Sequence, residues 1–305
     1  MSDALQKVTL RQLQIFLVAA DTLSFARAAG ILKLTPPAVS MQMSSLGEEL
    51  GVPLFQKTGR RLELTPAGEK LVPYAQRITS TLREASEAIQ ALQGVERSTA
   101  RVAMVTTSRN FGPHLVARFQ AAHPEIHLDI AIANRRSVID KLENNQVDLA
   151  LMGRTPKRID VEAQPFAEHP YVIIASPNHP LAATKNIDPR RLSGEVFLAR
   201  ESGSGTRMVL NHFLRENGQE SPRIQEIGGN ENIKQAVMAN MGIAVISRHT
   251  IHLELQAGRL VELDVQGMPQ VRTWFVVHLK GKELPPAARR FKQFVEQEGP
   301  GFMAE

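Results

Sequence analysis

Apolar positions in the first fifty residues recur at helical spacing, in two short stretches joined by a tight turn. The second stretch follows Thr35, whose hydroxyl can cap a helix start, and its two prolines fall in the first turn, where a missing N–H costs nothing. Its apolar residues share one face: Val39, Met43, Leu46 and Leu50. The pattern predicts a helix-turn-helix that places a helix in a DNA major groove; the alternative is a helical hairpin in an ordinary core.

The opposite face of this helix carries small or flexible side chains with little reason to pack inward, and we expect it to meet DNA. Residues 54–65 form two apolar-anchored stretches around a cationic turn with a glycine, which predicts a β-hairpin that contacts phosphates or enters a minor groove. A solvated run of charges is the alternative for that turn. The predicted DNA-contacting residues are Thr35, Pro36, Pro37, Ser40, Met41 and Ser44 on the helix, and Lys57, Arg60 and Arg61 on the hairpin.

A strict heptad pattern follows this hairpin, with apolar residues spaced alternately by four and three positions. A period of about 3.5 residues favours pairing with a second helix, so residues 67–94 are predicted to form a long helix that makes a homodimer, with a kink or a break at Pro73. The alternative is a helix packed against its own domain. The heptad residues are Leu71, Ala75, Ile78, Leu82, Ala85, Ile89 and Leu92.

From residue 95 onward, short apolar strands alternate with helical stretches, which is typical of an α/β domain. Segments rich in proline and glycine near 165–170 and 267–269 are predicted to cross between two lobes and so to leave a cleft. We expect lobe I to comprise residues 95–170 and 270–305, and lobe II residues 171–269. The predicted strands include residues 101–105, 126–132, 147–152, 171–175, 196–199, 243–246 and 274–278, and the predicted helices include 206–216 and 231–240.

Two strand-to-helix turns offer hydrogen-bond donors to a ligand in that cleft. The first is a Thr-Thr-Ser turn, where hydroxyls and free N–H groups converge, and the second is a glycine-rich turn over residues 201–207. A helix cap without a ligand is the alternative for each turn. Arginines and asparagines at further strand ends suit a phosphorylated or polycarboxylate molecule. The predicted ligand-binding residues are Thr106, Thr107, Ser108, Asn134, Arg135, Arg154, Glu201, Ser204, Thr206, Arg207 and Asn230.

Composition and charge exclude several classes of protein. A net charge of +5 and a pI near 9.6 fit a polyanionic partner. The sequence has no cysteine, which excludes disulfides, thiolate metal sites and cysteine catalysis. Because no histidine pair has metal-ligand spacing and no Gly-x-Ser-x-Gly frame occurs, we expect neither a metal site nor an enzyme. Without a long apolar run or an export signal, the chain is expected to be cytoplasmic, without membrane contact, and not an exported solute-binding protein.

Residues 24–68, SFARAAGILKLTPPAVSMQMSSLGEELGVPLFQKTGRRLELTPAG, resemble without a gap the winged helix-turn-helix of LysR-type transcriptional regulators. The resemblance implies a DNA-binding domain over residues 1–66 and an effector-binding domain over residues 95–305, with two lobes joined by two crossover strands as in periplasmic binding proteins. Family members commonly carry a Gln that reaches bases where this chain has Pro36. We therefore expect base readout to rely on apolar contact between Met41 and thymine methyl groups.

Several stretches are similar to one subgroup of that family, the activators of Calvin-cycle carbon dioxide fixation operons. They are LTPPAVSMQM, DLALMGRTP, HPYVIIASPNHPLA, RESGSGTR, GGNENIKQAVMANMGIAVIS and VRTWFVVH. The resemblance implies a homodimer that assembles to a homotetramer on promoter DNA, engages RNA polymerase and needs no cofactor. It also implies an anionic effector such as a phosphorylated sugar, phosphoenolpyruvate or NADPH. The alternative is a LysR-type regulator of another metabolic operon with a different effector.

Overall fold

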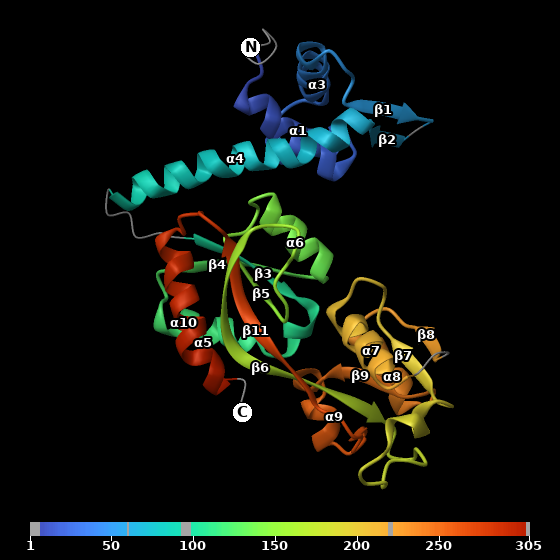
Figure 1. Cartoon of the computed structure of the whole chain (residues 1–305). Helices are drawn as coiled ribbons and strands as arrows, with labels where there is room; N and C mark the ends of the chain where they lie inside the picture. The colour runs from blue at the N-terminus through green and yellow to red at the C-terminus, as the bar shows by residue number, and fades with distance from the viewer. Residues whose placement is uncertain (1–6, 60, 93–98, 219–221, 303–305) are drawn as a thin grey trace. The chain divides into compact units, whose positions relative to one another are not determined.

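The computed structural model describes residues 7–59, 61–92, 99–218 and 222–302. Its contacts divide the chain into two compact units, residues 1–93 with 144–146 and residues 94–143 with 147–305 (Figure 1). Within these ranges, no helix is both long enough and apolar enough to cross a membrane.

The first unit is a winged helix-turn-helix that ends in a long helix. Helix α1 (Leu10–Thr22) begins with a capping box, in which the Thr9 hydroxyl accepts from the Gln12 N–H and the Gln12 side chain accepts from the Thr9 N–H at 2.7 Å. Helix α3 (Pro36–Leu50) begins where Thr35 and the two prolines predict. The other elements are α2 (Phe25–Leu32), β1 (Phe55–Thr58), β2 (Arg61–Leu64) and α4 (Pro66–Leu92).

A small apolar core fixes the β1–β2 hairpin and α4 against the first three helices. Phe55 of β1 packs edge-on against Phe16 and Phe25, with ring centroids 5.7 and 5.2 Å apart. Gly68 in the first turn of α4 lies against the backbone of Leu54, and a Cβ atom at residue 68 would come within 2.2 Å of the Leu54 carbonyl oxygen. Only glycine therefore allows this close approach between α4 and the chain that enters the hairpin.

Helix α4 continues without interruption through Pro73, so the predicted break at that residue does not occur. Proline removes one backbone hydrogen bond at this point. The neighbouring Leu71 and Ala75 pack into the core of the first unit, which holds the backbone helical on both sides of Pro73. The first half of α4 is thereby anchored to its own unit.

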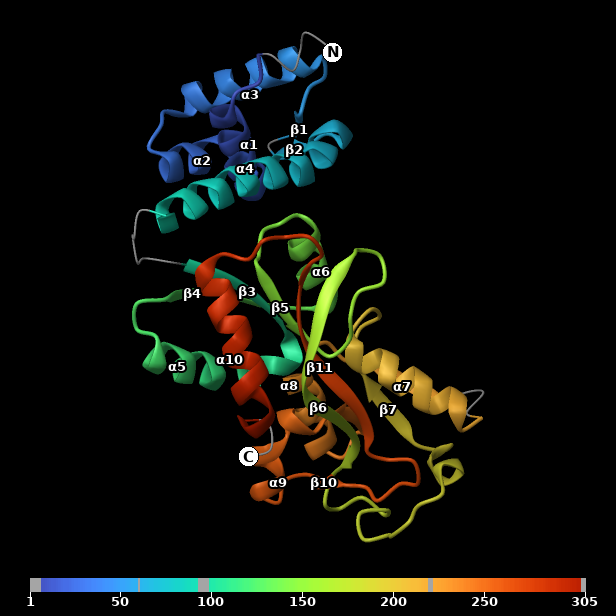
Figure 2. The same ribbon diagram turned by 60° about the vertical axis from the view of Figure 1, so that its left-hand side comes forward.

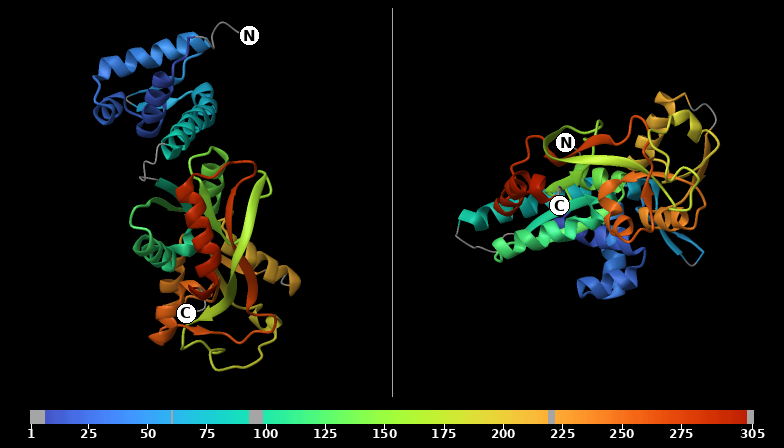
Figure 3. Two further views of the ribbon diagram at one scale, coloured as in Figure 1. Left: turned by 90° about the vertical axis from the view of Figure 1, so that its left-hand side faces the viewer. Right: turned by 90° about the horizontal axis from the view of Figure 1, so that it is seen from below.

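The second unit is an α/β domain, and its first lobe is built on parallel strands. Lobe I contains β3 (Thr99–Val105), the 3₁₀ helix η2 (Thr106–Asn110), α5 (Gly112–Ala122), β4 (His127–Ala133), α6 (Arg135–Glu143), β5 (Leu149–Met152) and α10 (Pro286–Phe302). Strand β3 lies between β4 and β5, so right-handed crossovers place α5 and α6 on opposite faces of the sheet. Helix α10 packs beside α5 (Figure 3).

Two long antiparallel strands carry the chain between the lobes. They are β6 (Val161–Ala175) and β11 (Gln270–Leu279), which pair along the whole of β11, with a bulge at Phe166 of β6 (Figure 2). The first contains the predicted crossing at residues 165–170, whereas the second begins directly after the predicted segment 267–269. The predicted strand over residues 171–175 is only the end of β6. The first ten residues of β6 alternate irregularly between buried and exposed positions, so they contain no regular apolar pattern that would predict a strand.

Lobe II packs helices around a second, smaller group of strands. It contains η3 (Pro189–Leu192), β7 (Val196–Ala199), α7 (Gly205–Glu216), β8 (Arg223–Glu226), α8 (Asn230–Met238), β9 (Ala244–Ser247), η4 (Arg248–Thr250), α9 (His252–Gln256) and β10 (Val261–Glu262). Strands β9 and β10 join the main sheet beside β6, and β7 pairs with β8. The predicted strand over residues 196–199 coincides with β7. The predicted strand over residues 243–246 lies one position before β9.

Candidate functional sites

The exposed face of α3 is the first candidate site. Thr35, Pro36, Pro37 and Ser44 are exposed, and the Met41 side chain is 66% exposed although it is apolar. Ser40, the remaining predicted contact on this helix, is half-buried. The Thr35 hydroxyl caps the helix by accepting from the Ala38 N–H at 3.4 Å. Of the predicted inward face, Val39, Met43 and Leu46 are buried and Leu50 is half-buried, so α3 presents its other side for contact.

A buried polar side chain positions α3, and the sequence analysis did not find it. Gln12 of α1 is only 4% exposed, and its amide Nε2 donates to Ser45 Oγ at 3.4 Å and to Glu49 Oε1 at 3.3 Å. The Ser45 hydroxyl also donates to Glu49 Oε1 at 3.1 Å. These bonds join α1 to the middle and end of α3 and restrict how α3 can turn about its axis.

The hairpin forms as predicted, with Thr58 and Arg61 paired across a turn in which Gly59 has a positive φ of +65°. The Lys57 and Arg61 side chains are exposed. Arg60 lies outside the described residues. The two described cations are therefore held on a short hairpin and are open to solvent.

The heptad residues of α4 fall into two groups. Leu71 and Ala75 belong to the core of the first unit, as the alternative interpretation required. Beyond them the side chains of Ile78, Leu82 and Ile89 are 46%, 48% and 57% exposed, and Ala85 is exposed as well. The Leu92 side chain lies outside the described residues. The second half of α4 thus carries an apolar stripe that nothing in the first unit covers.

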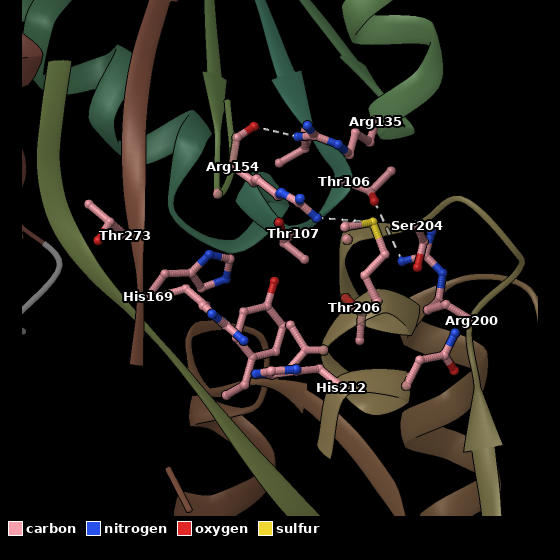
Figure 4. Close-up of a pocket in the computed structure, with 18 of the residues that line it drawn as sticks. Thr106, Thr107, Arg135, Arg154, His169, Arg200, Ser204, Thr206, His212 and Thr273 are labelled. Atoms are coloured by element: carbon pink, nitrogen blue, oxygen red, sulfur yellow. Dashed lines mark hydrogen bonds between the residues drawn. The ribbon is translucent and has the colours of Figure 1, made fainter. Parts of the chain in front are cut away.

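A second candidate site is a cavity of about 770 Å³ between lobes I and II, bounded by the crossover strands (Figure 4). It lies at the carboxyl end of β3 and at the start of α7, where free N–H groups and hydroxyls gather. Six of the eleven predicted ligand-binding residues line it: Thr106, Thr107, Arg135, Arg154, Ser204 and Thr206.

Two of the other predicted residues serve as local caps outside the cavity lining. The Ser108 hydroxyl is fully buried and donates to the Val105 carbonyl at 2.7 Å. The Asn134 side chain accepts from the Ser137 N–H at 2.9 Å, at the start of α6. Both residues shape the turns that carry lining residues, but neither faces the cavity.

Glu201, Arg207 and Asn230 also lie outside the lining, because each is bound to Arg200 instead. Glu201 forms an ion pair with the Arg200 guanidinium at 2.7 Å, which lowers the pKa of its carboxyl group. Arg207 donates to the Arg200 carbonyl at 3.2 Å and to Asn211 Oδ1 at 3.1 Å. The Asn230 side chain accepts from Arg200 Nη1. In the structure these three residues hold Arg200 in place, and their predicted contact with a ligand stays a prediction.

Arg200 is itself a lining residue that the sequence analysis missed. It is 4% exposed, and its Nη1 also reaches the Thr106 hydroxyl of lobe I at 3.5 Å. Its place directly after strand β7 was the available signal, since residues at strand carboxyl ends converge on such clefts. Further lining residues that were not predicted include His169, Tyr171, His212, Arg215, Arg272 and Thr273.

The charges around the cavity have one sign. Among the described residues, five arginines line it, at positions 135, 154, 200, 215 and 272, and no aspartate or glutamate does. Arg135 Nη2 donates to the Thr155 carbonyl at 3.0 Å and its Nη1 to the Arg154 carbonyl. Burial and the neighbouring charge of Arg154 lower the pKa of the Arg135 guanidinium, yet arginine stays protonated in proteins. The cavity is therefore suited to an anionic ligand.

Aromatic side chains of the crossover strands form the floor of the cavity. The His169 ring stacks on Trp274 with centroids 4.1 Å apart, and His169 Nε2 lies 2.9 Å from the Ser247 hydroxyl. Burial and the nearby His249 lower the pKa of His169 well below its usual value, so its ring is neutral at pH 7. Burial raises the pKa of Tyr171, so its hydroxyl stays protonated and available as a hydrogen-bonding group.

Family models match both units of the chain. A model described as a bacterial regulatory helix-turn-helix protein of the lysR family matches residues 10–69. A second, described as a LysR substrate binding domain, matches residues 93–300. The two together cover the exposed α3 face, the hairpin and the cavity.

Known proteins are similar over almost the whole length. The RuBisCO operon transcriptional regulator of Allochromatium vinosum is 44% identical over 291 residues, which cover 95% of this chain and 96% of that protein. The HTH-type transcriptional regulator CfxR of Cupriavidus necator is 44% identical over 97% of this chain and 93% of its own length. A solved structure, the regulatory domain of CcmR from Synechocystis PCC6803 in complex with 2-PG, is 35% identical with a TM-score of 0.63, and covers 65% of this chain and 96% of that domain.

Proposed function

The chain belongs to the LysR family of bacterial DNA-binding transcriptional regulators, and we propose that it activates carbon dioxide fixation genes in response to an anionic metabolite. The observation that carries the proposal is a cavity lined by five arginines and no carboxylate. Such a cavity attracts phosphate and carboxylate groups, which arginine holds through paired hydrogen bonds. Relatives named for the RuBisCO operon support the choice of target genes.

The ligand we propose is a phosphorylated or polycarboxylate metabolite held by the turn at Thr106, the start of α7 and the lining arginines. The similar CcmR regulatory domain is described in complex with 2-PG, which supports an anion of this kind. A phosphorylated sugar, phosphoenolpyruvate and NADPH all belong to the same chemical class. The neutral His169 and Tyr171 on the floor of the cavity add hydrogen-bonding groups without adding charge.

In this proposal, the exposed face of α3 lies in the major groove of DNA, and the hairpin contacts the DNA backbone. Pro36 has no side-chain donor, so base readout depends on neighbouring groups. Met41 offers an exposed apolar surface that suits the methyl group of thymine. Lys57 and Arg61 are placed on the exposed hairpin, where they contact phosphates and set the register.

The exposed stripe on the second half of α4 forms the dimer contact in this proposal. Ile78, Leu82 and Ile89 are large apolar residues at heptad spacing, and burying them against a second copy removes that surface from water. A two-fold dimer presents two recognition helices to the two halves of an inverted repeat. Two such dimers make the tetramer that meets RNA polymerase at the promoter.

Ligand binding acts on DNA through the lobes. Because both lobes contribute to the cavity, an anion bound there favours one arrangement of the lobes over another. It can shift the equilibrium between two DNA complexes only to the extent that its affinity for them differs. The crossover strands β6 and β11 carry His169 and Trp274 and connect the cavity to both lobes.

Fluorescence anisotropy tests the choice of target genes. The full chain is titrated onto a duplex with an interrupted inverted repeat from a RuBisCO operon promoter, and onto the same duplex with the repeat scrambled. We expect the promoter repeat to bind at least about a thousandfold more tightly at physiological salt. Equal binding to the two duplexes contradicts a role at this operon and favours a regulator of another metabolic operon.

A further inference from the structure

The cavity extends along one face of α7 for most of that helix. Ser204, Met208, His212 and Arg215 all line it, at steps of four, four and three residues, which is the spacing of one helical face. From residue 204 to residue 215 the helix axis rises by about 16 Å. The lining therefore has two ends, a buried end at the start of α7 and an open end near its last turn.

Two guanidinium groups at the open end have no partner among the described residues. Arg215 and Arg272 are exposed, and neither side chain makes a hydrogen bond or an ion pair within the part of the chain that the structure describes. His212 lies 3.0 Å from the Glu216 carboxylate, which is itself not part of the lining. At the buried end, by contrast, Arg200 is paired with an acidic residue. Cations gathered at a cavity wall repel one another unless an anion joins them.

The two ends belong to one continuous space. Arg272 reaches it from the wall opposite α7, because it lies on β11 directly across from His169 of β6. Arg200 of the buried end, Arg215 and Arg272 of the open end, and Tyr171 all line this one cavity. A single ligand in the cavity can therefore contact groups at both ends.

From this geometry we infer a second anion subsite at the open end, formed by His212, Arg215 and Arg272, that takes a phosphate or carboxylate group. The inference rests on the proposed function, in which the buried end holds the first anion. One extended ligand with an anionic group at each end fills both subsites. Because a linker joins the two groups, the second contact forms within the bound complex and raises the affinity. A cavity of about 770 Å³ has room for such a molecule.

Calorimetric titration of the full chain with two matched probes tests the subsite. Octane-1,8-diyl bisphosphate and octyl phosphate differ only in the second phosphate group. We expect the bisphosphate to bind at least about tenfold more tightly than octyl phosphate. Having two identical ends would by itself raise the affinity only about twofold, so a larger ratio requires a second contact. In the double variant Arg215→Gln, Arg272→Gln the ratio of affinities should fall to about twofold.

The control variant Arg191→Gln, Arg223→Gln removes two exposed charges of lobe II outside the cavity lining, and should keep the wild-type ratio. A twofold ratio in the wild type, or an unchanged ratio in the Arg215, Arg272 variant, overturns the second subsite. Thr106→Val separates this result from the proposed function. If that variant binds octyl phosphate as tightly as the wild type, the buried end is not the first anion site, whatever the ratio.

Discussion

Gly153 lies against His169 so closely that a Cβ atom at residue 153 would come within 2.5 Å of the imidazole Nδ1. The ring cannot move aside easily, because it stacks on Trp274 and is hydrogen-bonded to Ser247. Gly153 begins the loop whose next carbonyls accept from Arg135. The contact therefore ties a cavity-lining loop of lobe I to the strand that crosses between the lobes.

Gly153→Ala should destabilise this region, because the added methyl group overpacks a rigid contact. We expect the free energy of unfolding to fall by about 1–3 kcal/mol. Urea unfolding followed by the fluorescence of Trp274, the single tryptophan of the chain, measures the loss at this spot. Gly194→Ala is the control, since nothing lies within 4 Å of a Cβ at residue 194. Equal unfolding curves for the two variants would show that the contact carries no strain.

Stability should fall as the solution becomes acidic. The pKa of His169 lies well below its usual value in the folded chain, so below about pH 6.5 the unfolded chain binds a proton that the folded chain does not. Between pH 6.5 and 5.5 this difference lowers the free energy of unfolding by up to about 1 kcal/mol. His169→Gln should flatten the pH dependence of urea unfolding, whereas His114→Gln, at an exposed position, should leave it steep.

The hairpin should contribute affinity that does not depend on sequence. In the Lys57→Ala, Arg61→Ala variant, binding to operator and scrambled duplexes should weaken together. The slope of log K against log salt should become shallower by about 1.8, or about 0.9 for each lost phosphate contact. The control is the variant Lys157→Ala, Lys280→Ala, which lowers the net charge by the same amount at exposed positions of the second unit. A salt slope unchanged in the hairpin variant would remove the hairpin from the DNA interface.

The exposed stripe of α4 should determine the oligomeric state. In the Ile78→Asp, Leu82→Asp variant, charges replace apolar groups at the proposed seam, so light scattering after gel filtration should give the monomer mass of 33.7 kDa. The control is the variant Arg83→Asp, Gln90→Asp. It introduces two aspartates on another face of α4 and should leave the oligomer intact. A wild-type monomer, or an intact oligomer in the seam variant, would contradict a dimer through α4.

Local signals predicted much of the fold. The start of α3 followed from Thr35 and the two prolines, because caps act on neighbouring residues alone. The heptad pattern of α4 was read correctly as a helix, but periodicity does not tell which apolar residues its own domain covers. Ala75 is buried in the first unit and Ile78, one turn later, is exposed. That division depends on where the core ends in space.

The cavity could be predicted only in part, because its floor is made by pairing distant segments. His169 and Arg272 face each other across β6 and β11, although about a hundred residues separate them. Four ligand contacts were predicted in the glycine-rich turn, and Ser204 and Thr206 line the cavity whereas Glu201 and Arg207 do not. The structure instead turns Arg200 to the cavity, and Arg207 donates to the Arg200 carbonyl. Sequence position near a turn does not fix which side chain points inward.

Calorimetric titration with natural anions decides whether the cavity is an effector site. The full chain is titrated with 2-PG, ribulose bisphosphate, phosphoenolpyruvate and NADPH, and so is the variant Arg154→Gln, which lacks one lining charge. We predict that at least one anion binds once per chain, and that Arg154→Gln weakens it by about tenfold or more while Arg223→Gln does not. Binding of none of the four, or binding that Arg154→Gln leaves unchanged, would contradict an anionic effector in this cavity.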